Sequence, residues 1–315
     1  MRCNLCGSAD NEIIFDQPRF EKINVLKCKN CGLVFLESGK TEKEIELFYE
    51  KSYRKVDTLP RKSAEEMFND PVTRQDCKDR AEWIRKRYGN IEGKRILEIG
   101  SSSGYFLDTL ASSGAEVLGV ELTADYADYA KSLGFTVYTR PVEELDFKNE
   151  FDLVVSFHTL EHVFDPIAVL SAVRTALKER SGVFMGEVPN QDDWRLKIFD
   201  NYVVKRFHYD PFHNYYFSPV TLTSYLQKCS FSDIILETVE RYNSLVQLTR
   251  ILCGGYNQDS VEKVLKRDVF AQPEEDVRIP RPDNRRQTEF NRVFEKGVNS
   301  ELMGNCLRWM AARGD

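Results

Sequence analysis

The sequence predicts an α/β protein whose main domain is a Rossmann-like, mostly parallel sheet, preceded by a small cysteine-rich segment. Two observations lead to this prediction. Between residues 91 and 240, short apolar runs typical of buried strands alternate with segments of helical periodicity. Near the start of the chain there are two Cys-x-x-Cys-Gly motifs, with 21 residues between Cys6 and Cys28. A chain of 315 residues has room for both parts.

The two cysteine motifs run from Cys3 to Gly7 and from Cys28 to Gly32. Each motif directs two thiolates to one point, and the glycine that follows permits the turn. Two such pairs make a tetrahedral site that suits Zn²⁺ and leaves no coordination position open, so this zinc is expected to be structural and to supply folding energy. Two redox dithiols are the alternative. The predicted metal ligands are Cys3, Cys6, Cys28 and Cys31.

The chain divides into four predicted segments. Residues 1–40 form a zinc-binding ribbon, and residues 41–90, which are charged and have helical periodicity, form a helical linker. Residues 91–240 contain the sheet domain. Residues 241–315 form a C-terminal extension, in which residues 301–312 are either a last, antiparallel strand that completes the sheet or a helix.

Within the sheet domain, the pattern predicts six strands and three helices. Gly114 and Gly134 stand where helices are expected to stop. The strands are expected at residues 95–99, 116–120, 135–139, 151–157, 182–188 and 231–240, and the helices at 105–111, 125–133 and 218–229.

A loop of small residues, Gly100 to Gly104, joins the first strand to the first helix. Small residues there allow a ligand to approach the backbone. Glu121 ends the next strand, 21 residues beyond Gly100. An acidic residue at this spacing is placed to accept hydrogen bonds from ribose hydroxyls, so the sequence predicts a nucleotide site of the Rossmann type. A strand–turn–helix without a ligand is the alternative.

The loop distinguishes between two nucleotide cofactors. The G-x-G-x-x-G pattern of NAD sites is not met, although Glu121 could support NADH. The stretch from Glu98 to Gly104 resembles motif I of class I S-adenosylmethionine (SAM)-dependent methyltransferases, [DE]-x-G-x-G-x-G, with Ser102 in place of the middle glycine. SAM has an amino-acid end and no phosphate, which suits a carboxylate at Glu98.

The resemblance extends to "FDLVVSFHTLEHVFDP", residues 151–166, which is similar to the fourth-strand region of the same superfamily. The chain departs from the family at Pro141, where an acid usually holds the adenine amine. The resemblance implies a set of cofactor-binding residues on and after the strands. These are Tyr53, Glu98, Gly100, Ser101, Ser102, Gly104, Glu121, Leu122, Val142, Glu143, Phe157 and His158.

The four histidines follow two of the predicted strands, at the sheet edge where ligands of open α/β sheets bind. His158 to His162 also spells H-x-x-E-H, a metalloprotease motif when it lies on a helix. Its place behind a buried strand favours the methyltransferase interpretation instead, with His158 beside the cofactor and second choice as general base.

"PFHNYYFSP", residues 211–219, resembles a segment of sugar C-methyltransferases that also begin with a four-cysteine zinc module. Related O-methyltransferases share this layout. The resemblance implies that His213 is the general base and that the acceptor is a sugar or nucleotide-linked sugar. Phe212 stands where those enzymes have a glutamate, and the segment after residue 240 is shorter than their C-terminal domain.

Composition excludes several other classes. The net charge of −6 disfavours nucleic acid as a partner, so an RNA methyltransferase that uses the zinc ribbon for binding is a weaker alternative. A SAM-binding module without catalysis is a further alternative. The chain lacks N-P-P-Y after the fourth strand and has no Pro-Cys nucleophile. No apolar run is long enough to span a membrane, and the first residues lack a signal-peptide core, so a cytoplasmic location is expected.

Overall fold

A computed structural model of the chain describes residues 1–18, 22–37, 62–199, 202–241 and 284–314. Tyr53, predicted to lie near the cofactor, is outside these residues. In the described ranges, no helix combines the length and the apolar character that crossing a bilayer requires.

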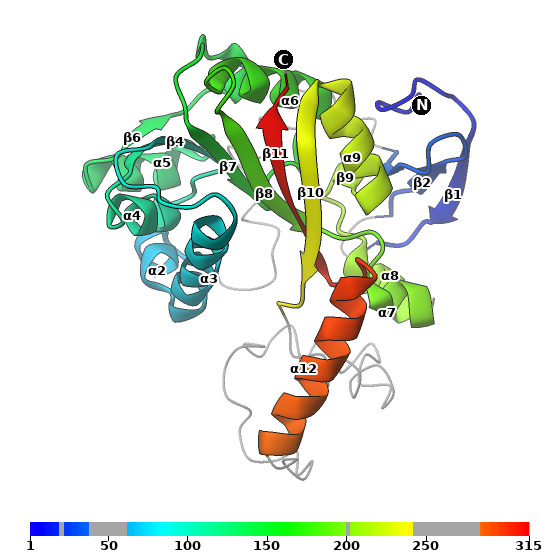
Figure 1. The fold of residues 1–315 in the computed structure, drawn as a ribbon. Coiled ribbons are helices and arrows are strands. Elements are labelled where there is room, and N and C mark those ends of the chain that lie inside the picture. Colours follow the sequence, from blue (N-terminus) through cyan, green and yellow to red (C-terminus); the bar gives the residue numbers. More distant parts are fainter. Residues whose placement is uncertain (19–21, 38–61, 200–201, 242–283, 315) are drawn as a thin grey trace.

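Among the described residues, seven strands form the central sheet, in the order β10-β11-β8-β7-β4-β5-β6 (Figure 1). Neighbouring strands are parallel except that β11 runs antiparallel between β8 and β10. The predicted fold class is therefore confirmed, and the C-terminal segment is a strand. The bounds are β4 (Arg95–Ile99), β5 (Glu116–Val120), β6 (Thr136–Tyr138), β7 (Leu153–Phe157), β8 (Val183–Pro189), β10 (Phe231–Val239) and β11 (Cys306–Arg313).

Strand register places the candidate site at one edge of this sheet. Ile99 pairs with Val120 on one side and with Ser156 on the other, so β4, β5 and β7 end at the same level. The segments that follow these three strands, beginning at Gly100, Glu121 and His158, therefore meet at the carboxyl edge of the sheet.

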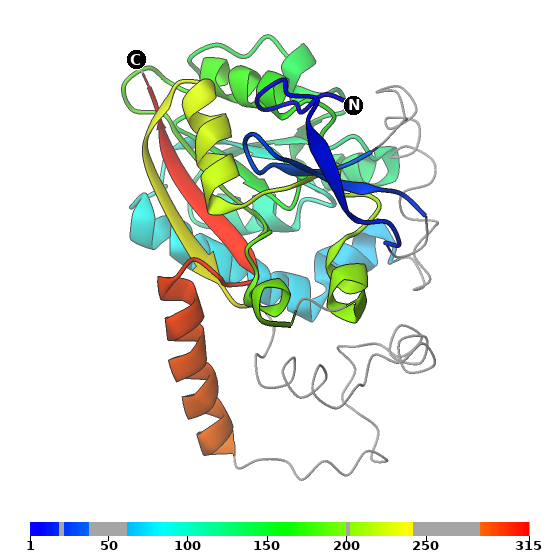
Figure 2. The same ribbon diagram turned by 90° about the vertical axis from the view of Figure 1, so that its right-hand side faces the viewer.

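Helices cover both faces of the sheet. α3 and α4 lie on one face with α5 beside α4, whereas α6 and α9 lie on the other. α12 extends away from the sheet (Figure 2). The bounds are α2 (Ala64–Asn69), α3 (Pro71–Arg87), α4 (Tyr105–Ala111), α5 (Ala124–Ser132), the 3₁₀ turn η1 (Val142–Glu144), α6 (Pro166–Ala176), α7 (Trp194–Phe199), α8 (Tyr202–His208), α9 (Pro219–Lys228) and α12 (Asn284–Ser300).

The starts of four helices follow from local sequence. The side chains of Ser63, Asp70, Asp165 and Ser218 each accept a hydrogen bond from a backbone N–H of the first turn. Proline follows directly after the last three, where its missing N–H is not needed. These caps explain why the helical patterns begin where they do.

The position of α3 differs from the prediction of a helical linker over residues 41–90. Trp83 and Ile84 are buried against Ile96 of β4 and Leu153 of β7. A helix that buries a face against two central strands is part of the sheet domain, because its loss would expose that core. The described portion of the predicted linker therefore belongs to the domain.

The N-terminal cysteine module, residues 1–40 as far as they are described, forms a second sheet. It contains β1 (Asn11–Phe15), β2 (Val25–Cys28) and β3 (Val34–Leu36), and its fourth strand is the distant β9 (Tyr215–Tyr216). Its apolar residues Leu5, Leu26 and Leu33 belong to the same hydrophobic core as α6 and α9. The module predicted as a zinc-binding ribbon therefore shares a hydrophobic core with the main domain, and its strands lie on the side of the sheet domain where α9 packs (Figures 1 and 2).

Candidate active site

Two glycines shape the loop after β4. Gly100 has φ +78°, and a Cβ there would lie 2.1 Å from Oγ1 of Thr159. Gly104 has φ +84°, and a Cβ there would lie 3.0 Å from Cβ of Ala130. Both positions therefore need glycine for conformation and for space. Thr159 is itself fixed, because its hydroxyl donates to the carbonyl of Ile99 at 3.2 Å.

Glu121 connects this loop to the end of β5. Its Oε2 accepts a hydrogen bond from the backbone N–H of Ser102 at 2.8 Å, and its Oε1 accepts one from the backbone N–H of Thr123 at 2.8 Å. The carboxylate is 8% exposed. Ser102 has φ +49°, the region that glycine occupies without strain, which explains why the related motif has glycine there.

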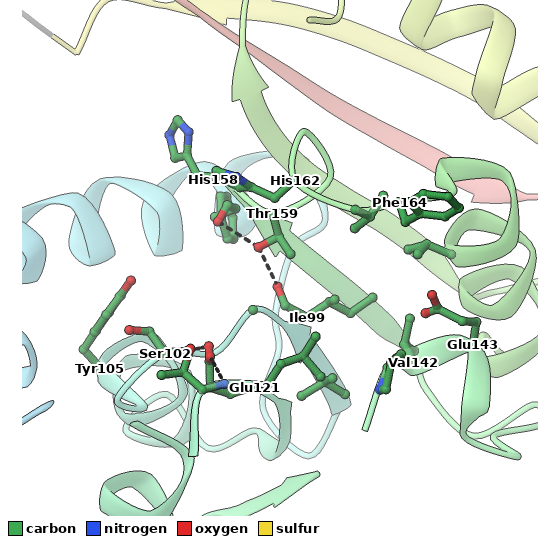
Figure 3. A pocket seen from close by; sticks show the side chains of 18 of the residues that line it. Ile99, Ser102, Tyr105, Glu121, Val142, Glu143, His158, Thr159, His162 and Phe164 are labelled. Atoms are coloured by element: carbon green, nitrogen blue, oxygen red, sulfur yellow. Dashed lines mark hydrogen bonds between the residues drawn. The ribbon is translucent and has the colours of Figure 1, made fainter. Parts of the chain in front are cut away.

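A cavity of about 300 Å³ opens between these groups and the turn after β7 (Figure 3). This volume is at the lower end of the range for small-molecule sites. Ser102 and Glu121 lie across the cavity from His158 and His162. The predicted cofactor residues that line it are Gly100, Ser102, Glu121, Leu122, Val142, Glu143, Phe157 and His158.

Three predicted cofactor residues do not line this cavity: Glu98, Ser101 and Gly104. Glu98 on β4 lies near Cys77 and Arg80 of α3 and is 3% exposed, and its Oε2 accepts no hydrogen bond from the part of the chain that the structure describes. Burial raises the pKa of Glu98 to about 8, and the nearby charge of Glu121 adds to this effect against the attraction of Arg80. Glu98 is thus mostly protonated at neutral pH.

A buried carboxylate, Glu187 on β8, organises the charged groups behind the cavity. It is fully buried and contacts Arg308 at 2.7 Å, His158 at 2.9 Å and Arg80 at 3.5 Å, with Arg241 also in contact. Burial alone would favour the neutral acid, but His158 and the arginines outweigh it and hold the pKa of Glu187 well below its ordinary value.

His158 is positioned between two buried carboxylates. Its Nε2 lies 2.9 Å from Oε1 of Glu187, and its Nδ1 lies 3.4 Å from Oε1 of Glu161. Removal from water opposes the charge on the ring, but hydrogen bonds to Cys306 and to the two carboxylates outweigh it and raise the pKa of His158 well above its ordinary value. Both ring nitrogens face a buried carboxylate, and the base role of His158 stays a prediction.

His213 is separated from the cavity by His162. The two rings meet edge to face with centroids 4.7 Å apart, and it is His162 that lines the cavity. Burial, together with the neighbouring His162, lowers the pKa of His213 well below its ordinary value. The ring is therefore neutral at physiological pH, and it reaches the cavity only through His162.

The H-x-x-E-H pentad does not form a protease-type zinc site. It lies in a turn after β7 and not on a helix, so the two histidines do not share a helical face. His158 faces Glu187, whereas His162 faces Phe212 and His213.

The four N-terminal cysteines lie close enough to hold one ion. Sγ of Cys3 is 3.5 Å from that of Cys31, and Sγ of Cys6 is 3.5 Å from that of Cys28. All four sulfurs lie within 4.8 Å of one another. Tetrahedral zinc–thiolate bonds of about 2.3 Å place sulfurs about 3.8 Å apart, so the cluster fits the predicted Zn²⁺. Among the described residues, Cys77, Cys229 and Cys306 are buried free thiols.

Comparison with known proteins agrees with this geometry. A family model described as a methyltransferase domain matches residues 73–234, just over half of the chain. The chain belongs to this methyltransferase family. The match begins within α3, which is Pro71–Arg87.

Individual relatives of this methyltransferase match over shorter lengths. The ubiquinone biosynthesis O-methyltransferase of Bordetella avium is 32% identical over 113 residues, or 33% of this chain and 47% of that protein. Its counterpart from Acinetobacter baylyi is 28% identical over 118 residues, or 35% and 50%. The chain spans about half the length of the curated relatives it matches. A SAM-dependent methyltransferase structure from Archaeoglobus fulgidus has a TM-score of 0.49 at 22% identity, covering 78% of this chain and 96% of that one.

Sequence reasoning missed several residues that line the methyltransferase cavity. Arg80 comes from α3, and its guanidinium carbon lies 4.5 Å from the centre of the Phe157 ring. No motif marks this arginine, since only the packing of α3 brings it to the site. Thr159 and Phe164 lie within residues 151–166, the stretch similar to the fourth-strand region of the superfamily, and could have been included from their place after β7.

Proposed function

We propose that this chain transfers the methyl group of SAM to a hydroxyl of a small-molecule acceptor. The observation that carries the proposal is the geometry of the loop after β4. Gly100, which has no side chain, lines the cavity together with Glu121, whose carboxylate accepts a hydrogen bond from the loop. The names of the relatives favour oxygen as the acceptor atom.

The lining residues suit the parts of SAM. Glu121 retains lone pairs for ribose hydroxyls, and Leu122 and Val142 offer apolar surface for the adenine. Arg80 is a cation within the cavity wall and suits the carboxylate of the methionine part. Glu143 lines the cavity close to Pro141, so it is the acid available to the adenine amine.

SAM supplies a methyl group on a sulfonium, which leaves as an electrophile. The protein's contribution is to hold the acceptor oxygen in line with the carbon–sulfur bond. The acceptor loses its hydroxyl proton, and the oxygen's electron pair forms the bond to the methyl carbon. The carbon–sulfur bond breaks with its pair left on sulfur, so the products are the methyl ether, S-adenosylhomocysteine and one proton.

A histidine is the simplest group to assist this proton loss. His213 is neutral and can therefore accept a proton, but the histidine that lines the cavity is His162. A sugar or nucleotide-linked sugar acceptor rests only on the resemblance of residues 211–219. We also propose that Cys3, Cys6, Cys28 and Cys31 hold a structural zinc ion.

Calorimetric titration of the purified protein with S-adenosylhomocysteine and, separately, with NADH tests the cofactor. Micromolar binding of S-adenosylhomocysteine without NADH binding is the expected result. Binding of NADH alone would overturn the proposal. An acceptor screen with radiolabelled SAM then compares catechols, other phenols and nucleotide sugars, and transfer to an oxygen is expected.

A further inference from the structure

Asn214, the residue before β9, connects two distant parts of the chain. Its side-chain amide donates to the carbonyl of His162 at 2.7 Å and to that of Val163 at 3.3 Å. Its own carbonyl accepts a hydrogen bond from the N–H of Leu36, the last residue of β3, at 3.1 Å. One residue therefore links the turn after β7 to a strand of the N-terminal module.

Tyr215 makes the same kind of connection one residue later. Its backbone N–H donates to the carbonyl of Glu161 at 3.2 Å, and its hydroxyl donates to that of Phe164 at 2.9 Å. On β9 it pairs with Phe35 of β3. Together with Asn214, it supplies donors to the four successive carbonyls of residues 161–164.

The turn depends on these donors because it has no regular structure of its own. Residues 161–164 belong to neither a helix nor a strand, so their carbonyls are outside a regular hydrogen-bond ladder. Within the turn, the N–H of His162 donates to the carbonyl of Thr159 at 2.9 Å. A carbonyl that is shielded from water and has no donor is costly, so the conformation of the turn rests on the segment before and within β9.

The N-terminal module in turn holds β9 in place. Tyr216 is 2% exposed and belongs to one hydrophobic cluster with Val34 and Leu36 of β3. The module also reaches the far end of the turn, where Asn4 Nδ2 donates to Oδ1 of Asp165 at 3.2 Å. The same module therefore contacts the turn directly at one end and, through β9, along its carbonyls.

We propose that Asn214 is a positioning residue for methyl transfer, and that the N-terminal module acts through it to hold the acceptor side of the active site. The proposal rests on the proposed function, in which SAM occupies the side of the cavity formed by Ser102 and Glu121. His162 lies on the opposite side, and Val163 also lines the cavity (Figure 3). The acceptor then meets the wall whose backbone Asn214 holds, and correct placement of an acceptor supplies much of the rate.

Hydrogen exchange of the full chain, followed by mass spectrometry, tests the positioning without an acceptor. Asn214→Ala should speed the exchange of residues 158–165 by about fivefold to tenfold, because opening of the turn then breaks fewer hydrogen bonds. Tyr215→Phe loses only the hydroxyl that donates to Phe164 and should have a smaller effect on the same residues. Val34→Ala loosens the packing of β9 from within the module and should also speed the exchange of the turn.

Asn24→Ala is the matched control. The Asn24 amide donates to Oε2 of Glu37 at 2.7 Å on the surface of the module, so the variant loses a similar hydrogen bond without a link to the turn. It should leave the exchange of residues 158–165 unchanged.

Affinity and turnover separate positioning from general loosening of the domain. Asn214→Ala should bind S-adenosylhomocysteine within about twofold of the wild-type affinity, because the groups proposed to hold the cofactor lie after β4 and β5. With the acceptor found in the screen, its KM for the acceptor should rise by about fivefold or more while its KM for SAM stays unchanged.

Three results would contradict the proposal. Unchanged exchange of residues 158–165 in Tyr215→Phe and in folded Asn214→Ala would overturn the positioning role, and unchanged exchange in Val34→Ala would overturn the part played by the module. Equal losses of affinity for S-adenosylhomocysteine and for the acceptor in Asn214→Ala would show that this residue supports the whole domain. Failure of the unmodified protein to bind S-adenosylhomocysteine contradicts the proposed function instead, whatever the exchange of the turn shows.

Discussion

The cysteine module and the loop after β4 use glycine differently, although their glycines have nearly the same φ. Gly7 and Gly32 have φ of +77° and +79°, and a Cβ there would meet no atom of the described residues within 4 Å. Gly100 has φ +78°, but a Cβ there would lie 2.1 Å from Oγ1 of Thr159. In the module, four thiols gather at one point and the backbone only turns. In the loop, the backbone itself is the wall of the site.

The largest effect is expected from removing a side chain of the module. Cys28 is fully buried and belongs both to the cysteine cluster and to the core shared with the main domain. Cys28→Ser should lose the zinc ion and lower the free energy of unfolding by about 4 kcal/mol or more. Metal release into a chelating dye and urea unfolding measure the two effects. Cys229 is a buried thiol outside the cluster, so the control variant Cys229→Ser should keep its zinc. A Cys28→Ser protein that still holds a full equivalent of zinc would contradict the assignment.

A methyl group added to each kind of glycine tests the comparison directly. Gly100→Ala should weaken S-adenosylhomocysteine binding by about 100-fold or more, because Thr159 and the loop must move. Gly32→Ala should cost only the strain of the left-handed conformation, about 1–2 kcal/mol of stability, and leave that affinity intact. Calorimetry and thermal unfolding of both variants supply the measurements. Equal losses of affinity would refute the distinction.

Glu98, which is buried on β4 two residues before Gly100, tests whether burial also controls the protonation of a carboxyl group beside the loop. The pKa of Glu98 is raised from 4.5 to about 8, so between these values the native protein holds a proton that the unfolded chain has lost. The stability contributed by this proton falls as pH rises through the window. Glu98→Gln removes this dependence of stability on pH. The free energy of unfolding of the variant, relative to that of the wild type, should therefore rise by about 1 kcal/mol per pH unit from pH 5 to 8.

Urea unfolding of wild type and Glu98→Gln at matched pH values gives this difference, in which the titration of other groups largely cancels. A difference that stays constant from pH 5 to 8 would show that Glu98 is ionised in the folded protein.

Ser102→Gly should have the smallest effect. Glycine relieves the positive φ of +49° but gains freedom in the unfolded chain, so the two changes nearly cancel and stability should shift by less than about 1 kcal/mol. The backbone N–H that donates to Glu121 is retained. A tenfold or larger loss of S-adenosylhomocysteine affinity would instead show that the Ser102 hydroxyl contacts the cofactor.

The sequence predicted the elements whose structure depends on interactions between residues that are close together in the chain. The strand–glycine–helix order around Gly100 and the acid at Glu121 follow from short patterns, and the structure has both. Residues 301–312 remained open between strand and helix, because an apolar segment fits either and only the gap between β8 and β10 makes it a strand.

The remaining site residues depend on contacts between distant segments. Arg80 reaches the cavity because α3 packs on the sheet. His213 reaches His162 because the next residues, Asn214 and Tyr215, donate hydrogen bonds to backbone carbonyls of the turn after β7. Neither contact leaves a periodic pattern. One signal was available, since Glu187 interrupts the apolar strand "VFMGEVP", and an acid at such a position requires buried partners.

The pairing of β9 with β3 also has a consequence for the order in which the chain is made. β3 ends at Leu36, and its partner Tyr216 is synthesised about 180 residues later. At ribosomal rates this interval is about 10–40 s. During it the nascent cysteines can already capture zinc, while the edge of β3 has no partner and is open to other strands. Truncated chains that end before residue 215 should therefore retain zinc and aggregate through that edge.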